Sequence, residues 1–252
     1  MPREFHTVLC DLDGVVWLAH QPIPGSVDAV AALRAAGRRV LFVTNNSSAT
    51  IADHERALAQ VGIDAVGDVV SSSMAAATLL RSGERVLVAG GPGVVEAVDG
   101  AGAEVVHNTG AALVAPVDAV VVGLHREFDY GRLSVAGRAV LDGARLIATN
   151  SDTTYPTPTG LEPGGGSIAA AIGAVGGVEP DFAGKPEQPM ADLVLGMVDG
   201  DRNGVLMVGD RPDTDGLFAE RIGCAFALVE SGVTAKGDGT HADLAGVARG
   251  LD

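Results

Sequence analysis

The sequence contains little lysine and little cysteine, and it has no long apolar run. Two of its 252 residues are lysines, Lys185 and Lys236, and two are cysteines. So few cysteines exclude a disulfide-stapled scaffold, and they lack the spacing of a zinc site. No stretch approaches the roughly 20 apolar residues of a membrane span, and no long apolar segment precedes Asp11 to form a signal peptide. We therefore expect a cytoplasmic protein without a membrane partner.

The charge balance is strongly acidic, with a net charge of −15 at pH 7 and a sequence pI of about 4.6. Apolar residues make up 47% of the chain and charged residues 19%, a composition typical of folded globular proteins. An acidic surface repels phosphate backbones and anionic lipids, which excludes nucleic-acid or membrane binding as the main function. Any anionic substrate therefore needs a local source of positive charge.

Short apolar runs alternate with helical patterns along the chain. The runs predict strands over residues 7–10, 39–43, 69–71, 85–89, 119–124, 146–149, 205–208 and 224–229. The patterns predict helices over residues 27–36, 51–60, 74–80, 94–101, 131–141, 167–174 and 242–250, with another helix ending at residue 222. Ser26 is expected to cap the first helix. Apolar strands that alternate with helices predict an α/β fold built on a doubly wound parallel sheet.

Two glycine-rich segments interrupt this pattern. Residues 150–166 form a loop rich in threonine, proline and glycine, and loops of this length in a compact chain are usually functional or mobile. The segment 90–93 follows a strand but lacks the glycine spacing of a dinucleotide-binding loop, so a plain turn is favoured there.

Polar side chains follow three of the predicted strands at the points where the strands end. They are Asp11 and Asp13, Thr44 with Asn45, and Asp210 with Asp213 and Asp215. The carboxyl ends of parallel strands meet at one edge of a sheet, where open α/β sheets bind their ligands. Carboxylates held this close repel one another unless a cation lies among them or one of them is protonated. Oxygen ligands of this kind suit Mg²⁺, so the pattern predicts a magnesium site.

The same sheet edge offers groups for a phosphate. Residues 44–47 precede a helix, so their backbone N–H groups are suited to binding a phosphate. Lys185, in the sequence Gly-Lys-Pro, is a candidate for neutralising that anion. Each residue taken alone has a structural interpretation as a turn, cap or surface residue. Their common position at strand ends of one sheet favours the functional interpretation.

Four motifs in this order resemble the haloacid dehalogenase (HAD) superfamily of phosphohydrolases. They are D-L-D-G-V-V-W at 11–17, V-T-N-N-S at 43–47, G-K-P at 184–186 and G-D-R-P-D-T-D at 209–215. The second and fourth motifs resemble the branch of 4-nitrophenylphosphatases, phosphoglycolate phosphatases and glycerol-3-phosphate phosphatases. Further matches to this branch are residues 22–25, 148–152 and 231–234. The resemblance covers almost the whole chain.

The resemblance implies the chemical roles of two aspartates. Asp11 would be the nucleophile that attacks phosphorus and becomes an aspartyl phosphate. Asp13 would protonate the leaving alcohol and then activate water as a base. Asp11 and the backbone carbonyl of Asp13 would also ligate Mg²⁺.

The resemblance also implies which residues bind the phosphate and the metal ion. Thr44 and the amide of Asn45 would hold the phosphoryl oxygens, and Lys185 would offset charge between nucleophile and phosphate. Asp210 would ligate the metal directly, and Asp215 would support either Asp210 or Lys185. Asp213 belongs to the motif, but no role follows for it.

In this branch an inserted α/β cap of the type-2, subtype-A class interrupts the catalytic core. The resemblance therefore implies a core of residues 1–79 and 182–252 and a cap of residues 80–181. The loop 150–166 would face the leaving group, where Asn150, Asp152 and Thr154 are candidate substrate contacts, although each also suits an ordinary turn. Relatives with such caps often dimerise through them, which implies a homodimer.

The resulting expectation is a Mg²⁺-dependent phosphomonoesterase that acts on a small phosphorylated metabolite. Glycerol 3-phosphate is the first candidate, because the arginine-rich, lysine-poor chain resembles actinobacterial members of the branch. Alternatives are 2-phosphoglycolate, 4-nitrophenyl phosphate as an artificial substrate, and other sugar or vitamin phosphates. Inside the superfamily a phosphomutase remains open, and the alternatives from other classes are a receiver-type signalling domain and a non-catalytic phosphometabolite-binding protein. A receiver domain has about half this length and no cap.

Overall fold

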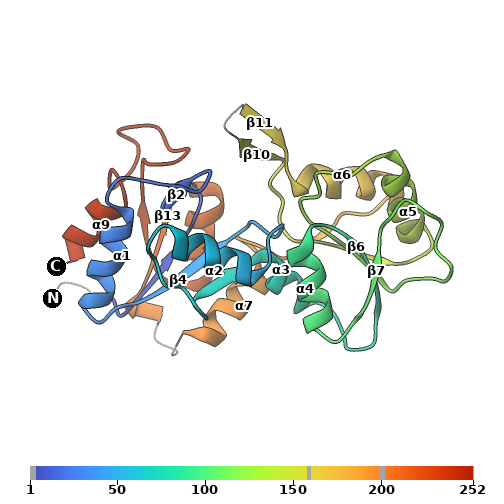
Figure 1. Cartoon of the computed structure of the whole chain (residues 1–252), viewed down its shortest axis with the longest axis horizontal. Coiled ribbons are helices and arrows are strands. Elements are labelled where there is room, and N and C mark those ends of the chain that lie inside the picture. Colours follow the sequence, from blue (N-terminus) through green and yellow to red (C-terminus); the bar gives the residue numbers. More distant parts are fainter. Residues whose placement is uncertain (1–3, 158–159, 199–201, 252) are drawn as a thin grey trace. The chain divides into compact units, whose positions relative to one another are not determined.

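The structure, a computed structural model, describes residues 4–157, 160–198 and 202–251 (Figure 1). The chain folds into two compact units. The core unit contains residues 1–44, 51–70 and 185–252, and the inserted unit contains residues 45–50 and 71–184. Compared with the expected cap of residues 80–181, the inserted unit also includes 71–79, 182–184 and the short segment 45–50, which carries part of the V-T-N-N-S motif.

A five-stranded sheet organises the core unit. Its strand order is β14-β13-β1-β4-β5, with bounds Ala225–Leu228, Val205–Gly209, Thr7–Cys10, Arg39–Thr44 and Val69–Ser71. The pairs of β1 with β13, β1 with β4 and β13 with β14 are parallel. All four residues of β1 are buried, as expected for a strand covered on both faces. The predicted doubly wound α/β architecture is confirmed.

Helices cover both faces of the core sheet. They are α1 (Ser26–Ala35), α2 (Ile51–Gln60), α7 (Gln188–Met197), α8 (Leu217–Ile222) and α9 (Leu244–Leu251). Val8, Cys10 and Phe42 pack on one face in a cluster with residues of α1, α2 and α9. Leu9 and Leu41 point to the opposite face and are equally buried. In Figure 1, α1 and α9 lie side by side.

The prediction that Ser26 caps the first helix is wrong. Gly25 occupies the N-cap position with φ 82°, and Ser26 is the first residue of α1. The Ser26 hydroxyl instead donates to the carbonyl of Val16 at 2.7 Å. Val16 precedes the short hairpin of β2 (Trp17–Leu18) and β3 (Gln21–Pro22), so this contact ties the hairpin to the helix.

The inserted unit has its own five-stranded sheet, in the order β12-β9-β8-β6-β7. The strands are Asp181–Phe182, Arg145–Ala148, Ala119–Val122, Arg85–Ala89 and Glu104–His107. Its helices are α3 (Ser72–Ala77), α4 (Pro92–Gly100), α5 (Tyr130–Leu141) and α6 (Gly165–Gly176). Side chains of α5 and α6 pack with Leu87 and Val120 of the sheet in a separate apolar core.

Several elements were not predicted from the sequence, among them the short strands β2, β3 and β12. The predicted loop 150–166 contains an antiparallel hairpin of β10 (Thr154–Thr157) and β11 (Gly160–Pro163). Strand β7 is an edge strand whose residues are only partly buried, so it lacks a clear apolar run. Helix α7 was missed because a proline lies in its first turn and Gly196 near its end, which mask its apolar face. Among the described residues, no helix combines the length and apolar character needed to cross a membrane.

Candidate active site

Three buried aspartates gather at the carboxyl edge of the core sheet. Asp11 follows β1 directly, and Asp210 follows the neighbouring strand β13. Asp215 lies in the π-helical turn Pro212–Gly216 that comes after Asp210. One carboxylate oxygen from each aspartate lies within 4.8 Å of the others. The sequence prediction that the ends of β1 and β13 bring their carboxylates together agrees with this geometry.

Lys185 lies among these carboxylates and is itself only 2% exposed. Its Nζ donates to Asp11 Oδ1 and to Asp215 Oδ1, both at 2.7 Å. Burial opposes the charge of Lys185, but the two carboxylates outweigh burial and raise its pKa. The lysine is therefore a cation at neutral pH, and Asp215 supports Lys185 directly.

Asp215 and Asp213 differ sharply in burial although they are two residues apart in the sequence. The Asp215 carboxylate is fully buried, and its second oxygen accepts the backbone N–H of Arg211 at 3.2 Å. A Cβ on Gly209 would lie 2.3 Å from the Asp215 carboxyl, so the chain passes very close to this side chain. Asp213 is exposed on the same turn, and nothing in the structure assigns it a role.

The two carboxylate oxygens of Asp210 have different surroundings. Asp210 Oδ2 accepts the backbone N–H of Val233 at 2.7 Å, whereas Oδ1 is buried without a hydrogen-bond partner in the described part of the chain. Burial raises the pKa of Asp210 to about 6 and the pKa of Asp11 well above its ordinary range. A buried, unpartnered oxygen beside other carboxylates is a costly arrangement that a cation relieves. Oxygen donors fit a hard cation such as Mg²⁺.

Asp13 lies two residues beyond Asp11 and is partly exposed. The indole Nε1 of Trp17 donates to Asp13 Oδ1 at 3.2 Å. Burial raises the pKa of Asp13, against the opposing effects of His20 and the indole hydrogen bond. A carboxyl group whose pKa is shifted toward neutrality can both give and take a proton, as acid–base work requires. Trp17 belongs to the motif at 11–17, but no local sequence pattern indicates its contact with Asp13.

Thr44 and Asn45 follow each other in the chain but belong to different units. Thr44 is the last residue of β4, next to β1 in the core sheet, and is buried. Asn45 opens the segment 45–50 of the inserted unit. Its carbonyl accepts the Ser72 hydroxyl at 2.8 Å and the Asn150 amide at 2.7 Å, and its own amide donates to Asp152 Oδ2 at 3.3 Å. The backbone at Asn45 is thus held by side chains of the inserted unit.

The three residues expected to contact substrate from the inserted unit have different surroundings. Asn150 is 6% exposed and uses its amide on Asn45, while its Oδ1 accepts the backbone N–H of Asp152 at 3.1 Å. Asp152 is partly buried beside Asn45, and Thr154 lies exposed on β10. In the inserted unit, Asn150 therefore orients neighbouring backbone, and contact of all three residues with substrate remains a prediction.

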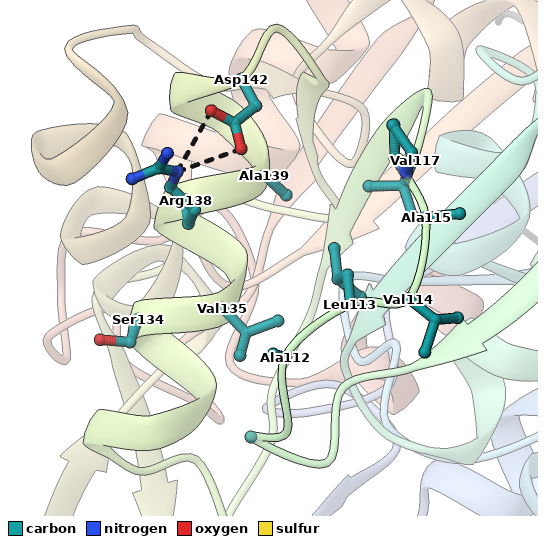
Figure 2. A pocket seen from close by; sticks show the side chains of 12 residues that line it. Ala112, Leu113, Val114, Ala115, Val117, Ser134, Val135, Arg138, Ala139 and Asp142 are labelled. Carbon is teal, nitrogen blue, oxygen red and sulfur yellow. Dashed lines mark hydrogen bonds and ion pairs between the residues drawn. The ribbon is translucent and has the colours of Figure 1, made fainter.

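The inserted unit also contains a cavity of about 730 Å³ between α5 and residues 110–117 (Figure 2). Figure 2 shows Leu113, Val117 and Val135 among the side chains that line it. Its carboxylate, Asp142, pairs with Arg138 at 3.1 Å. This lining is apolar, so the cavity suits packing against an apolar surface better than binding a phosphate.

Comparisons with known proteins agree with the geometry of the core unit. A model of the haloacid dehalogenase-like hydrolases matches residues 8–104, and a second HAD-hydrolase-like model matches residues 182–251. The chain is 36% identical to D-glycerol 3-phosphate phosphatase of Mycobacterium tuberculosis over 246 residues, which cover 96% of this chain and 67% of the relative. It is 34% identical to an acid sugar phosphatase of Staphylococcus haemolyticus over 236 residues, covering 92% and 88% of the two chains.

Solved structures give the same result. The p-nitrophenyl phosphatase of Archaeoglobus fulgidus has a TM-score of 0.89 at 28% identity, with 98% of this chain and all of that chain covered. The glycerol phosphate phosphatase of M. tuberculosis, solved in complex with magnesium, has a TM-score of 0.84 at 36% identity, with 92% and 69% covered. The chain therefore belongs to the haloacid dehalogenase-like hydrolases, within their phosphatase branch.

Proposed function

We propose that the protein is a Mg²⁺-dependent phosphomonoesterase, with glycerol 3-phosphate as the first candidate substrate. The observation that carries the proposal is the buried cluster in which Lys185 bridges Asp11 and Asp215 beside Asp210. This cluster provides a nucleophile, a fixed positive charge and a set of oxygen ligands within one small volume. Phosphoryl transfer depends mainly on such positioning and electrostatics.

In this proposal Asp11 and Asp13 divide the chemistry. The Asp11 carboxylate attacks phosphorus while the bond from phosphorus to the leaving oxygen breaks, and Asp13 donates its proton to that oxygen. Asp13 then takes a proton from water, which attacks the phosphorus of the aspartyl phosphate and releases inorganic phosphate and free Asp11. The hydrogen bond from Trp17 holds the Asp13 carboxyl in one orientation for both transfers.

The remaining groups hold the charges of the reaction. Lys185 reduces the repulsion between Asp11 and an approaching phosphate dianion, and Asp215 keeps the ammonium in place. Asp11, Asp210 and the carbonyl of Asp13 are the proposed Mg²⁺ ligands. When bound, the cation supplies further positive charge to the phosphoryl group. Thr44 and Asn45 are proposed to bind the phosphoryl oxygens.

We further propose that the inserted unit acts as a cap. Its segment 150–166 would then select the leaving group through Asp152 and Thr154. Glycerol 3-phosphate is the first candidate because the M. tuberculosis relative is named D-glycerol 3-phosphate phosphatase. A sugar phosphate is the main alternative because the staphylococcal relatives are named acid sugar phosphatases. The proposal also includes a cytoplasmic location, where small phosphorylated metabolites are available.

Phosphate release from a panel of esters tests this function. The panel contains glycerol 3-phosphate, 2-phosphoglycolate, 4-nitrophenyl phosphate and pyridoxal phosphate, each with Mg²⁺ and with a chelator. We expect release that depends on Mg²⁺ and a higher kcat/KM for glycerol 3-phosphate than for the other esters. A clear preference for another ester would correct the substrate. Folded protein that hydrolyses none of them at any Mg²⁺ concentration would refute the phosphatase proposal and favour a mutase or a binding protein.

A homodimer through the inserted unit is the proposed assembly. The apolar cavity beside α5 supports it, because Val114 at its edge is 98% exposed and would gain from being covered. Light scattering after size-exclusion chromatography should give twice the monomer mass for the wild type. The Val114→Asp variant should shift toward the monomer mass. A wild-type protein that runs as a monomer at all concentrations would contradict the proposal.

A further inference from the structure

A loop after β14 is anchored by its own hydrogen bonds. Val229 and His241 form an isolated parallel bridge at its base. Glu230 Oε1 accepts the backbone N–H groups of Gly237 at 2.8 Å and of Gly239 at 3.0 Å. These contacts hold the two ends of the loop together, and none of them involves an active-site residue. Its residues 231–234, here called the clamp loop, reach the carboxyl edge of the core sheet.

The clamp loop contacts Asp210 at three points. The backbone N–H of Val233 donates to Asp210 Oδ2 at 2.7 Å, and the Thr234 hydroxyl donates to the Asp210 carbonyl at 2.6 Å. A Cβ on Gly232 would lie 1.9 Å from Asp210 Oδ2, so the carboxylate rests against bare backbone there. Val233 as a residue is 59% exposed, and the contact it makes with Asp210 comes from its backbone N–H.

The clamp loop also contacts the turn that follows the nucleophile. The Ser231 hydroxyl donates to the carbonyl of Gly14 at 2.7 Å. Gly14 has φ +91°, and a Cβ there would lie 2.4 Å from Asp210 Oδ2. Gly14, Gly232 and the Val233 N–H therefore enclose Oδ2 and leave Oδ1 as the unpartnered oxygen.

We propose that the clamp loop is a positioning element that decides which oxygen of Asp210 binds the metal ion. It occupies Oδ2 and blocks rotation of the carboxylate, so that Oδ1 alone is presented to the cation. The inference rests on the proposed function in taking Asp210 as a Mg²⁺ ligand. Groups that orient a metal ligand typically contribute about 10- to 100-fold to metal affinity. Ser231, Gly232, Val233 and Thr234 thereby acquire a common role in the phosphatase.

The Gly232→Ala variant should show the largest effect, because its new methyl group collides with Oδ2. We expect the dissociation constant for Mg²⁺ to rise by at least about tenfold. Thr234→Val keeps the shape of the side chain but loses the hydroxyl that holds the Asp210 carbonyl, so a smaller rise is expected. Thr234→Ser keeps the hydroxyl and should restore affinity to within about twofold of the wild type.

The measurement is calorimetric titration of substrate-free protein with Mg²⁺, with circular dichroism to verify the fold of each variant. Gly196→Ala is the matched control, because a Cβ at Gly196 in α7 meets no atom within 4 Å. This control should bind Mg²⁺ like the wild type. In turnover assays, Thr234→Val should raise the half-saturating Mg²⁺ concentration while kcat at saturating Mg²⁺ changes little.

The outcomes separate this inference from the proposed function. If Gly232→Ala and Thr234→Val bind Mg²⁺ as tightly as the wild type, the clamp is overturned and the phosphatase proposal stands. If Thr234→Ser is as impaired as Thr234→Val, the loss does not come from the hydroxyl, which also overturns it. A wild-type protein that binds Mg²⁺ but hydrolyses no ester would contradict the proposed phosphatase function without contradicting the role of the clamp loop in Mg²⁺ binding. Absence of Mg²⁺ binding by the wild type would overturn both. Should Gly232→Ala fail to fold, the comparison of the two Thr234 variants decides alone.

Discussion

The Asp11→Asn variant is expected to lose phosphate release by about a thousandfold or more while it keeps its fold, as usual when a nucleophile is removed. An amide nitrogen or oxygen cannot form the aspartyl phosphate, so neither step of the reaction can proceed. The fold should survive because burial already raises the pKa of Asp11 and so disfavours its charged form. Lys185 would retain its contact with Asp215. Phosphate release with Mg²⁺ and thermal unfolding without Mg²⁺ check the two halves of this prediction.

Asp13→Asn is the informative companion to this variant. It removes the acid–base group but leaves the nucleophile, so we expect phosphate binding to persist while both chemical steps slow. Pre-steady-state measurement of aspartyl phosphate formation distinguishes the two variants. Normal turnover by Asp11→Asn would contradict the assignment of Asp11 as the nucleophile. Full activity of Asp13→Asn would exclude Asp13 as the acid and base.

The Lys185→Met variant is expected to lose both activity and stability. Methionine has a similar length but no charge, so Asp11 and Asp215 would be left buried without the ammonium they share. Breaking a buried ion pair in this way typically costs about 3–5 kcal/mol of unfolding free energy. Urea unfolding measures the loss, and phosphate release should fall because repulsion between Asp11 and the phosphate dianion is no longer offset.

The other lysine of the chain provides a matched control. Lys236 is exposed, so Lys236→Met should change the unfolding free energy by less than about 0.5 kcal/mol. A second comparison adds Asp215→Asn to Lys185→Met, which removes one of the stranded charges and should recover part of the lost stability. A Lys185→Met protein as stable as the wild type would show that Lys185 does not compensate the carboxylates.

The loss in Lys185→Met should depend on pH in a defined direction. Without the ammonium, burial raises the pKa of the Asp11 carboxyl in the folded state above its unfolded value. A raised pKa of this kind gives stability that is present below the unfolded pKa and is lost as pH rises through the folded pKa. The difference in unfolding free energy between Lys185→Met and the wild type should therefore shrink as the pH is lowered toward about 4, where aspartate carboxyls bind protons.

Much of the core fold is readable from local pattern. Strand β1 is a continuous apolar run, and continuous runs between helical patterns already imply a sheet buried on both faces. The elements that were not predicted have sequences that hide their structure. Helix α7 contains a proline and a glycine, which are typical of loops, and β7 is a partly exposed edge strand. The hairpin of β10 and β11 is rich in threonine and proline, which resemble turn residues more than strand residues.

By itself the sequence determined the strand ends, the order of the motifs and the kinds of atom at the sheet edge, because periodicity and residue chemistry are local properties. Only the tertiary structure decided which of these atoms meet. Lys185 reaches Asp11 across 174 positions of the chain, and Thr234 reaches Asp210 across 24. Asn45 follows Thr44 in sequence, yet Asn150 and Ser72 of the inserted unit hold its carbonyl. Such pairings depend on how sheets bring distant loops to one edge, and no local pattern records that.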